Sequence, residues 1–193
     1  MDNIIYEYMP KRTTKREFAL ISIFIAAAVG FFTVPTLFQD MQIAWLFQTS
    51  ALASFCGAIF IYTEFLSKDR VYRIVEDEDG KLTFTVSELM SKGRKTMMVC
   101  CFSLDCIESV SVFDNSSPAD VKRKNEFVAV AKKENRKRFS FYPEMTPIEI
   151  CSVLVYENKE KMLVNVVADK ELVEKFLEAA ERNAVSVDTD ETV

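Results

Sequence analysis

Two apolar segments near the N-terminus decide the fold of this chain: FALISIFIAAAVGFFTVPTLF at residues 18–38 and IAWLFQTSALASFCGAIFIYT at residues 43–63. Each is 21 residues long without Asp, Glu, Lys or Arg, and only four residues separate them. A helix of this length rises about 30 Å, at about 1.5 Å per residue, which matches the hydrocarbon core of a bilayer. Because a helix satisfies its own backbone hydrogen bonds in lipid, the segments predict a transmembrane helical hairpin over residues 18–66.

The charges around the hairpin predict its orientation. Basic residues stand on both sides of it: Lys11, Arg12, Lys15 and Arg16 before the first span, and Lys68, Arg70 and Arg73 after the second. The turn at residues 39–42 contains neither Lys nor Arg. Loops rich in Lys and Arg stay in the cytoplasm. We therefore expect a multi-pass protein of the cell membrane, with the basic N-terminal segment 1–17 and the C-terminal part both cytoplasmic.

Two other interpretations of the apolar segments have less support. The first span resembles a cleaved signal peptide in that Ala26, Ala27 and Ala28 offer small residues for a cleavage site. However, the apolar stretch continues for ten residues beyond them, and a second span follows at once. The segments could also be buried helices of a soluble domain, but their length and lack of charge favour membrane spans.

Small residues recur along the second span at helical spacing: Ser50, Ser54 and Ala58 lie four apart, as do Ala53 and Gly57. Small side chains at this spacing let two helix backbones approach closely, and the amide of Gln48 can hydrogen-bond across helices. We expect these residues to pack the two spans on each other. Alternatively, they form the interface of a homo-oligomer.

After the hairpin the chain changes to short apolar runs separated by turn residues, a pattern typical of β-strands. Strands are expected at residues 71–75, 81–88, 95–103, 107–113, 126–132, 136–142, 150–156 and 161–167, with a loop at 114–120. The strongly apolar run 95–103 suggests a central strand. Two hairpins are expected, one joining 126–132 to 136–142 around Glu134 and Asn135, the other joining 150–156 to 161–167.

An amphipathic helix is expected after the last strand. Asp169 is a good N-cap, and one apolar stripe follows it: Leu172, Val173, Phe176, Leu177 and Ala180. A short helix from Pro147 competes with strand 150–156, because residues 146–149 match a capping box, but the β-branched residues favour the strand. The small, acidic residues 184–193 are expected to be a disordered tail.

These elements resemble a pleckstrin-homology-like (PH-like) fold. The resemblance is carried by YRIVEDEDGKLTFTVSEL (72–89), FVAVAKKENRKRFSFYP (127–143) and MLVNVVADKELVEKFLEAAER (162–182). More narrowly, the chain is similar to bacterial membrane-anchored PH-like proteins, in which a two-span hairpin precedes such a domain. The resemblance implies an α+β fold, with a cytoplasmic PH-like antiparallel β-barrel or sandwich over residues 70–183 capped by the C-terminal helix. It also implies a non-catalytic interaction or regulatory module.

A basic cluster is the main candidate contact surface: Lys122, Arg123, Lys124, Lys132, Lys133, Arg136, Lys137 and Arg138. With two Glu, these residues give positions 122–138 a net charge of +6, on a chain whose net charge is -5. We expect the hairpin tip at 132–138 to face anionic lipid, where each basic residue adds about 1 kcal/mol of attraction. A solvated strand edge protected by charge is the alternative. Nucleic acid is disfavoured, because the chain is acidic and Phe139 and Phe141 share a core-facing side.

The sequence lacks the usual parts of a catalytic or metal site. It contains no His, and its four Gly are scattered rather than clustered into a phosphate-binding loop. Its five Cys show no C-x-x-C spacing, and Cys100 and Cys101 should point to opposite faces of a strand.

We therefore expect no enzyme activity, no cofactor, no metal and no small-molecule substrate. The expected partners are membrane lipid together with a protein partner or a second copy of the chain. The alternative function is that of a small subunit in a membrane complex, such as a transporter, with the hairpin as its working part.

Overall fold

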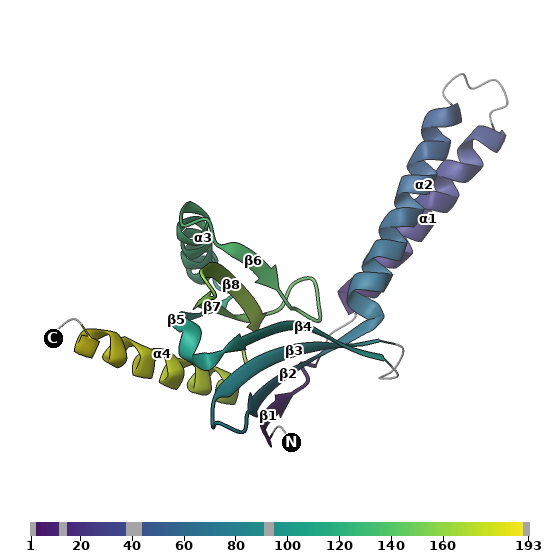
Figure 1. Ribbon diagram of the computed structural model, residues 1–193. Helices are drawn as coiled ribbons and strands as arrows, with labels where there is room; N and C mark the ends of the chain where they lie inside the picture. Colours follow the sequence, from purple (N-terminus) through teal and green to yellow (C-terminus); the bar gives the residue numbers. More distant parts are fainter. Residues whose placement is uncertain (1–2, 12–14, 38–43, 91–94, 191–193) are drawn as a thin grey trace. The chain divides into compact units, whose positions relative to one another are not determined.

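The computed structural model describes residues 3–11, 15–37, 44–90 and 95–190 (Figure 1). The chain divides into two compact units, one of Met1–Pro10 with Arg70–Val193 and the other of Lys11–Asp69. The first unit is called the sheet domain below, and the second the helical hairpin. The fold is α+β, with two four-stranded sheets and four α-helices among the described residues.

The helical hairpin consists of α1 (Lys15–Leu37) and α2 (Ala44–Ile61), and a π-helical turn over Tyr62–Leu66 extends α2. Both helices are long and apolar enough to cross a membrane, over Lys15–Pro35 and Ala44–Leu66. The two helices predicted at residues 18–38 and 43–63 are therefore present. The turn predicted between them, at 39–42, lies outside the described residues.

Sheet A is antiparallel in the order β1-β2-β3-β4. Its strands are β1 (Asn3–Tyr8), β2 (Lys68–Glu76), β3 (Leu82–Met90) and β4 (Lys95–Ser103). Strand β1 pairs with β2 in a register that places Asn3 opposite Glu76 and Tyr8 opposite Tyr72. The sequence-based division into a separate segment 1–17 and a domain 70–183 missed this strand. The helical hairpin is thus an insertion between two neighbouring strands of one sheet.

Sheet B has the order β5-β7-β8-β6. Its strands are β5 (Ile107–Asp114), β6 (Lys137–Ser140), β7 (Glu149–Glu157) and β8 (Glu160–Val167). The predicted hairpin between β7 and β8 is confirmed, and its turn residues Asn158 and Lys159 have φ of 51° and 67°. Strand β6 runs parallel to β8 at the edge of the sheet.

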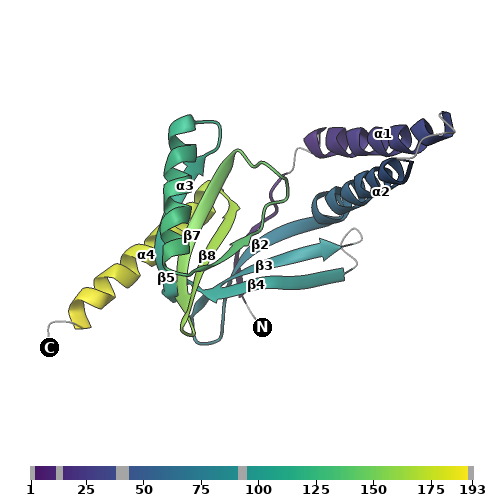
Figure 2. The ribbon, with the colours of Figure 1, turned by 90° about the horizontal axis from the view of Figure 1, so that it is seen from above.

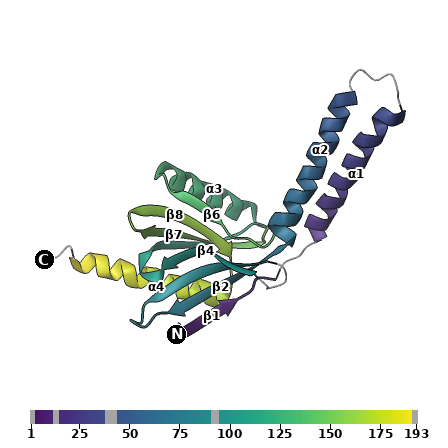
Figure 3. The same cartoon turned by 45° about the vertical axis from the view of Figure 1, so that its right-hand side comes forward.

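The predicted hairpin at residues 126–142 is wrong, because α3 (Pro118–Lys133) occupies its first half. Ser117 precedes a proline at the first helical position, a favourable start for a helix. The positions turned away from solvent recur at helical spacing: Val121, Lys124, Phe127, Val128 and Ala131. Helix α3 lies on the side of sheet B that faces away from sheet A (Figures 2 and 3), where the rings of Phe127 and Phe113 of β5 pack with centroids 5.6 Å apart.

The predicted final helix is present as α4 (Lys170–Asp190). Asp169 is its N-cap, and its Oδ2 accepts a hydrogen bond from the Leu172 amide at 3.4 Å. Leu172, Phe176 and Ala179 are buried, whereas Leu177 of the predicted stripe is 42% exposed. Residues 184–190, predicted to be disordered, continue this helix.

The core of the sheet domain lies between the two sheets and α4. It unites Tyr6, Tyr72 and Phe84 of sheet A with Val153 and Val164 of sheet B. On α4, Phe176 meets Phe84 edge-on, with ring centroids 5.0 Å apart. The strands of the described residues form two separate sheets and no closed barrel, so the barrel form of the expected domain is not found.

Strand β4 is an edge strand, which corrects the prediction that residues 95–103 form a central strand. Its first four residues, Lys95–Met98, are all exposed, and burial begins only toward its C-terminal end. Apolar Met97 and Met98 misled the prediction, because high hydrophobicity in a short run is normally a sign of burial on both faces.

Candidate interaction surfaces

The basic cluster is divided by the structure into two groups, because its residues lie on both ends of α3 and on β6. At the start of α3, the Arg123 guanidinium pairs with Asp120 at 2.9 Å, and the Lys124 ammonium donates to Asn115 Oδ1 at 3.0 Å. Partial burial and the nearby charge of Arg138 lower the pKa of Lys124. The charge of Arg138 therefore acts on Lys124, although 13 residues lie between them in the sequence.

Just beyond the end of α3, two of the positive charges are paired with carboxylates. The Arg136 guanidinium donates to Glu108 and to Glu134, each at 2.6 Å, and its side chain is only 5% exposed. Lys137 pairs with Glu160 at 2.6 Å. Arg136 thereby joins the end of α3 to the start of β5, and this pairing is structural rather than available to a ligand.

Among the exposed residues of the cluster, Arg123 and Lys137 pair with carboxylates and Arg138 lies on β6, which leaves three exposed lysines on α3. Lys122, Lys132 and Lys133 lie on the solvent side of α3, and none of them forms an ion pair within the described part of the chain. We call these three residues the α3 lysines. Val130, two positions before Lys132, is 52% exposed and adds an apolar side chain to the surface of this helix. The predicted contact surface is therefore a helix face, not the tip of a β-hairpin.

The helix-packing residues predicted on α2 fall on two sides of that helix. Ser50, Ser54 and Gly57 are half-buried and Ala58 is buried, whereas Gln48 and Ala53 are exposed. A Cβ atom added to Gly57 would lie 3.0 Å from Cε1 of Phe24 in α1. The backbone of α2 thus approaches α1 at the position where glycine leaves room for an aromatic ring.

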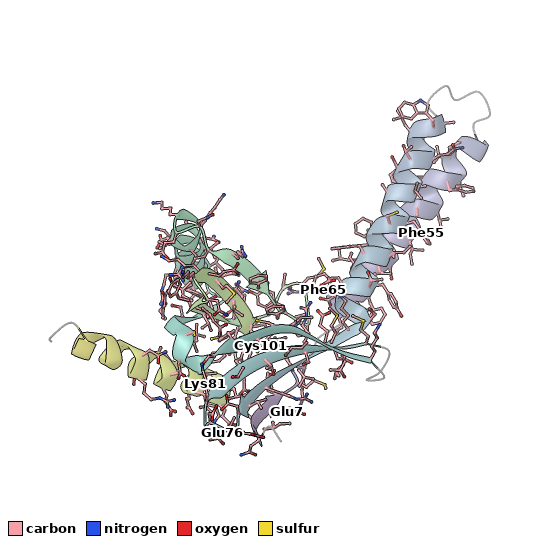
Figure 4. The ribbon with its side chains drawn as sticks, in the orientation of Figure 1. Glu7, Phe55, Phe65, Glu76, Lys81 and Cys101 are labelled. Atoms are coloured by element: carbon pink, nitrogen blue, oxygen red, sulfur yellow. The ribbon has the colours of Figure 1, made fainter. Side chains whose placement is uncertain are left out.

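A groove of about 570 Å³ runs along the hairpin beside this contact. It is lined by Ala28, Val29, Phe32 and Thr33 of α1 and by Gln48, Ala51, Leu52 and Phe55 of α2. Phe55, labelled in Figure 4, projects outward from the axis of α2. The lining is almost wholly apolar, and the Gln48 amide is its strongest hydrogen-bonding group.

Two polar ties within the sheet domain were not found by sequence reasoning. The Tyr6 hydroxyl donates to Asp169 Oδ2 at 2.7 Å, which fastens β1 to the N-cap of α4. Arg70 on β2 pairs with Glu88 on β3 at 3.2 Å and also donates to the Tyr142 carbonyl. The alternation of Ile4, Tyr6 and Tyr8 was the available signal for β1.

The thiols of the sheet domain are chemically quiet. Burial raises the pKa of Cys151 to about 12, and burial together with neighbouring Cys101 and Glu157 raises the pKa of Cys100 to about 12. Cys101 is exposed on β4 (Figure 4), and its pKa is also raised, by partial burial and by Glu157. No group of three His, Cys, Asp or Glu suited to a metal ion occurs in the described ranges. Thiols with raised pKa are poor nucleophiles near neutral pH.

Comparisons with known proteins found no relative: no protein-family model, no curated protein and no solved structure matches the chain. The candidate surfaces are therefore characterised by their own geometry and chemistry.

Proposed function

We propose that the chain is a non-catalytic, membrane-anchored interaction or regulatory module. In this proposal the helical hairpin crosses the cell membrane twice, and the sheet domain is held at the cytoplasmic face with both termini. The observation that carries the proposal is the pairing of β1 with β2 across the hairpin, with Tyr8 opposite Tyr72.

This pairing supports an even number of membrane crossings. Strands β1 and β2 belong to one sheet, so the chain on either side of the hairpin must lie on the same side of a bilayer. Removal of the first span as a signal peptide would also remove β1, including Tyr6, which is 6% exposed and hydrogen-bonded to Asp169. The pairing thus argues against the signal-peptide interpretation.

The outer faces of the hairpin support a lipid environment. Large apolar side chains are exposed on both helices: Phe18, Ile23, Val29 and Phe32 on α1, and Leu52, Phe55, Ile59 and Phe60 on α2. Contiguous apolar exposure of this kind is rare on soluble monomers and normal for helices in hydrocarbon. Basic residues on both flanks and none in the turn favour the cytoplasmic side for the sheet domain.

A PH-like assignment of the sheet domain is part of the proposal. Two packed sheets and a C-terminal helix in the core are common features, while α3 between β5 and β6 and the parallel edge strand β6 are departures. Small β-domains of this kind are filled by their own side chains, so partners would bind the surface. The α3 lysines would attract an acidic protein segment or anionic headgroups.

Limited proteolysis of sealed membrane vesicles tests the anchoring. Trypsin is expected to cut at the α3 lysines in inside-out vesicles and to leave the sheet domain intact in right-side-out vesicles. Digestion of the sheet domain from the outer side of sealed vesicles would overturn the proposed orientation.

Site-specific photo-crosslinking in cells tests the interaction role. A crosslinker at Lys133 of α3 is expected to capture a protein or lipid, whereas one at Lys159, an exposed lysine in the β7–β8 turn, serves as the matched control. Equal capture at both positions, or none at either, would contradict a contact surface on α3.

The groove on the hairpin favours a second candidate function, that of a small subunit in a larger membrane complex such as a transporter. A helix of another subunit would fill the groove and hydrogen-bond to Gln48. Copurification in detergent distinguishes the two functions. If a membrane protein copurifies equally well with Gln48→Ala and with the unmodified chain, the groove is not the binding site for that subunit.

A further inference from the structure

One end of sheet A carries an exposed corner that no contact within the described chain covers. The corner consists of the first four residues of β4, namely Lys95, Thr96, Met97 and Met98, and we call it the β4 corner. Met97 is 54% exposed and Met98 is 60% exposed. Because successive residues of a strand point to opposite faces, the two methionines present apolar surface on both sides of the strand.

The strand register places this corner at the end of the sheet where the chain enters and leaves the helical hairpin. Tyr8, the last residue of β1, lies opposite Tyr72, near the start of β2. Met90, the last residue of β3, lies opposite Lys95. The Arg70–Glu88 ion pair aligns the start of β2 with the end of β3. All four strands therefore have their hairpin-side ends together.

The opposite end of the sheet has a different character. There the β2–β3 turn is closed by the Asp77 amide donating to the Lys81 carbonyl at 3.1 Å, and Glu76 and Lys81 mark this end in Figure 4. The turn residues 76–80 are acidic apart from Gly80. Exposed methionines thus occur at the hairpin-side end, and acidic side chains gather at the far end.

The connection between the helical hairpin and β2 is short. Only Ser67 separates Leu66, where the π-helical turn ends, from Lys68, where β2 begins. Two extended residues span at most about 7 Å. Strand β4 lies two strand positions from β2, which is about 10 Å at the usual strand spacing. If the hairpin spans a bilayer, the corner is within reach of its interfacial layer.

We propose that the β4 corner is a second membrane contact, in which Met97 and Met98 enter the interfacial layer of the bilayer that the hairpin spans and Lys95 meets anionic headgroups. The proposal rests on the anchoring function proposed above. Methionine is flexible and apolar, which suits a disordered interface, and a basic residue near the surface favours anionic lipid. Two contacts restrict the orientation of the sheet domain relative to the membrane more than the hairpin alone.

Trp fluorescence in vesicles tests the contact, because Trp45 is the only tryptophan of the chain. The full chain is reconstituted into phosphatidylcholine and phosphatidylglycerol vesicles, with acyl chains brominated either near the headgroup or near the bilayer centre. The variants are Trp45→Phe with Met97→Trp and Trp45→Phe with Met98→Trp. The control is Trp45→Phe with Tyr156→Trp, because Tyr156 is 47% exposed but lies near the opposite end of β4 from the corner. Its neighbour Glu157 accepts a hydrogen bond from the amide of Ser103, the last residue of β4.

Bromines near the headgroup are expected to quench most of the emission of tryptophans at positions 97 and 98, and bromines near the bilayer centre are expected to quench less of it. The tryptophan at position 156 is expected to keep its emission with either lipid. Unchanged emission at 97 and 98, with native Trp45 still quenched, would overturn the corner contact and leave the anchoring intact. Absence of quenching at native Trp45 would overturn the anchoring as well. The tryptophans at 97 and 98 could instead be insensitive to bromine, while their emission wavelength changes when the protein is diluted with more lipid. That result would show that the corner contacts a second copy of the chain, and it would contradict the proposal.

Discussion

Replacing Tyr6 with phenylalanine removes the hydroxyl that fastens β1 to α4 and leaves the ring in the core. The hydroxyl donates to Asp169 Oδ2 at 2.7 Å, and Tyr6 is 6% exposed. Loss of a hydrogen bond to a charged acceptor costs about 1.5–3 kcal/mol. If β1 opens locally, this range corresponds to an increase of roughly 10- to 150-fold in its opening equilibrium, at about 1.4 kcal/mol per factor of ten.

Hydrogen exchange followed by mass spectrometry measures this opening in the full chain in detergent. Peptides covering β1 are expected to exchange faster in Tyr6→Phe by that factor, while peptides from β7 and β8 keep their protection. Tyr8→Phe is the matched control, since Tyr8 lies on the same strand and its hydroxyl makes no hydrogen bond among the described residues. Equal exchange of β1 in Tyr6→Phe and the unmodified chain would refute the proposed tie.

Three further outcomes are expected. Burial and Asp169 raise the pKa of Tyr6 above its usual 10.0, so the stability that the protonated hydroxyl contributes is complete below pH 10 and declines as the pH rises further. Protection of the β1 amides from hydrogen exchange should therefore fall at alkaline pH, and it should fall less steeply in Tyr6→Phe. Gly57→Ala and Gly30→Ala both gain helix propensity, worth up to about 1 kcal/mol, but only the methyl group added at position 57 would contact Phe24. In thermal denaturation in detergent, Gly57→Ala should therefore have the lower melting temperature of the two. Equal melting temperatures would contradict the close contact. Because its pKa is raised, exposed Cys101 should react slowly with iodoacetamide in the native chain, whereas buried Cys151 should react only after denaturation, as peptide mass mapping would reveal.

The elements with strong local signals could be predicted from the sequence. Charge-free runs of 21 residues indicated the two hairpin helices, and Asp169 with its apolar stripe indicated α4. The turn between β7 and β8 was equally clear, because Asn158 adopts a left-handed conformation that asparagine tolerates well. In these places propensity, pattern and turn chemistry agree with one another.

Elements that depend on tertiary context were missed. Val128 and Val130 suggested a strand in what is α3, because β-branched residues favour strands, although Ser117 and Pro118 were a helix start. Strand β1 is short, and its partner β2 begins only after both helices. The pairing that defines β1 as a strand is therefore visible only in the assembled sheet. The apolar start of β4 predicts a central strand, because nothing in the local sequence distinguishes exposed apolar residues from buried ones.

The candidate surface was predictable in composition but not in shape. The sequence places Lys122, Lys132 and Lys133 close together in a basic run, yet only the helical spacing of α3 turns all three to solvent. Two carboxylates neutralise Arg136, namely Glu134 and Glu108, and Glu108 lies 28 residues away in the sequence. Such long-range pairing has no local signature in a sequence.

The insertion of the hairpin between β1 and β2 has a consequence for how the protein is made. Strand β1 leaves the ribosome first, but its partner residues in β2 follow only after both helices have been translated. At about 5–20 residues per second, that interval lasts on the order of 3–13 s, and Asp169 emerges later still. Strand β1 must therefore wait unpaired until the partner residues of β2 have been translated. Synthesis of both helices thus precedes closure of the sheet during biogenesis.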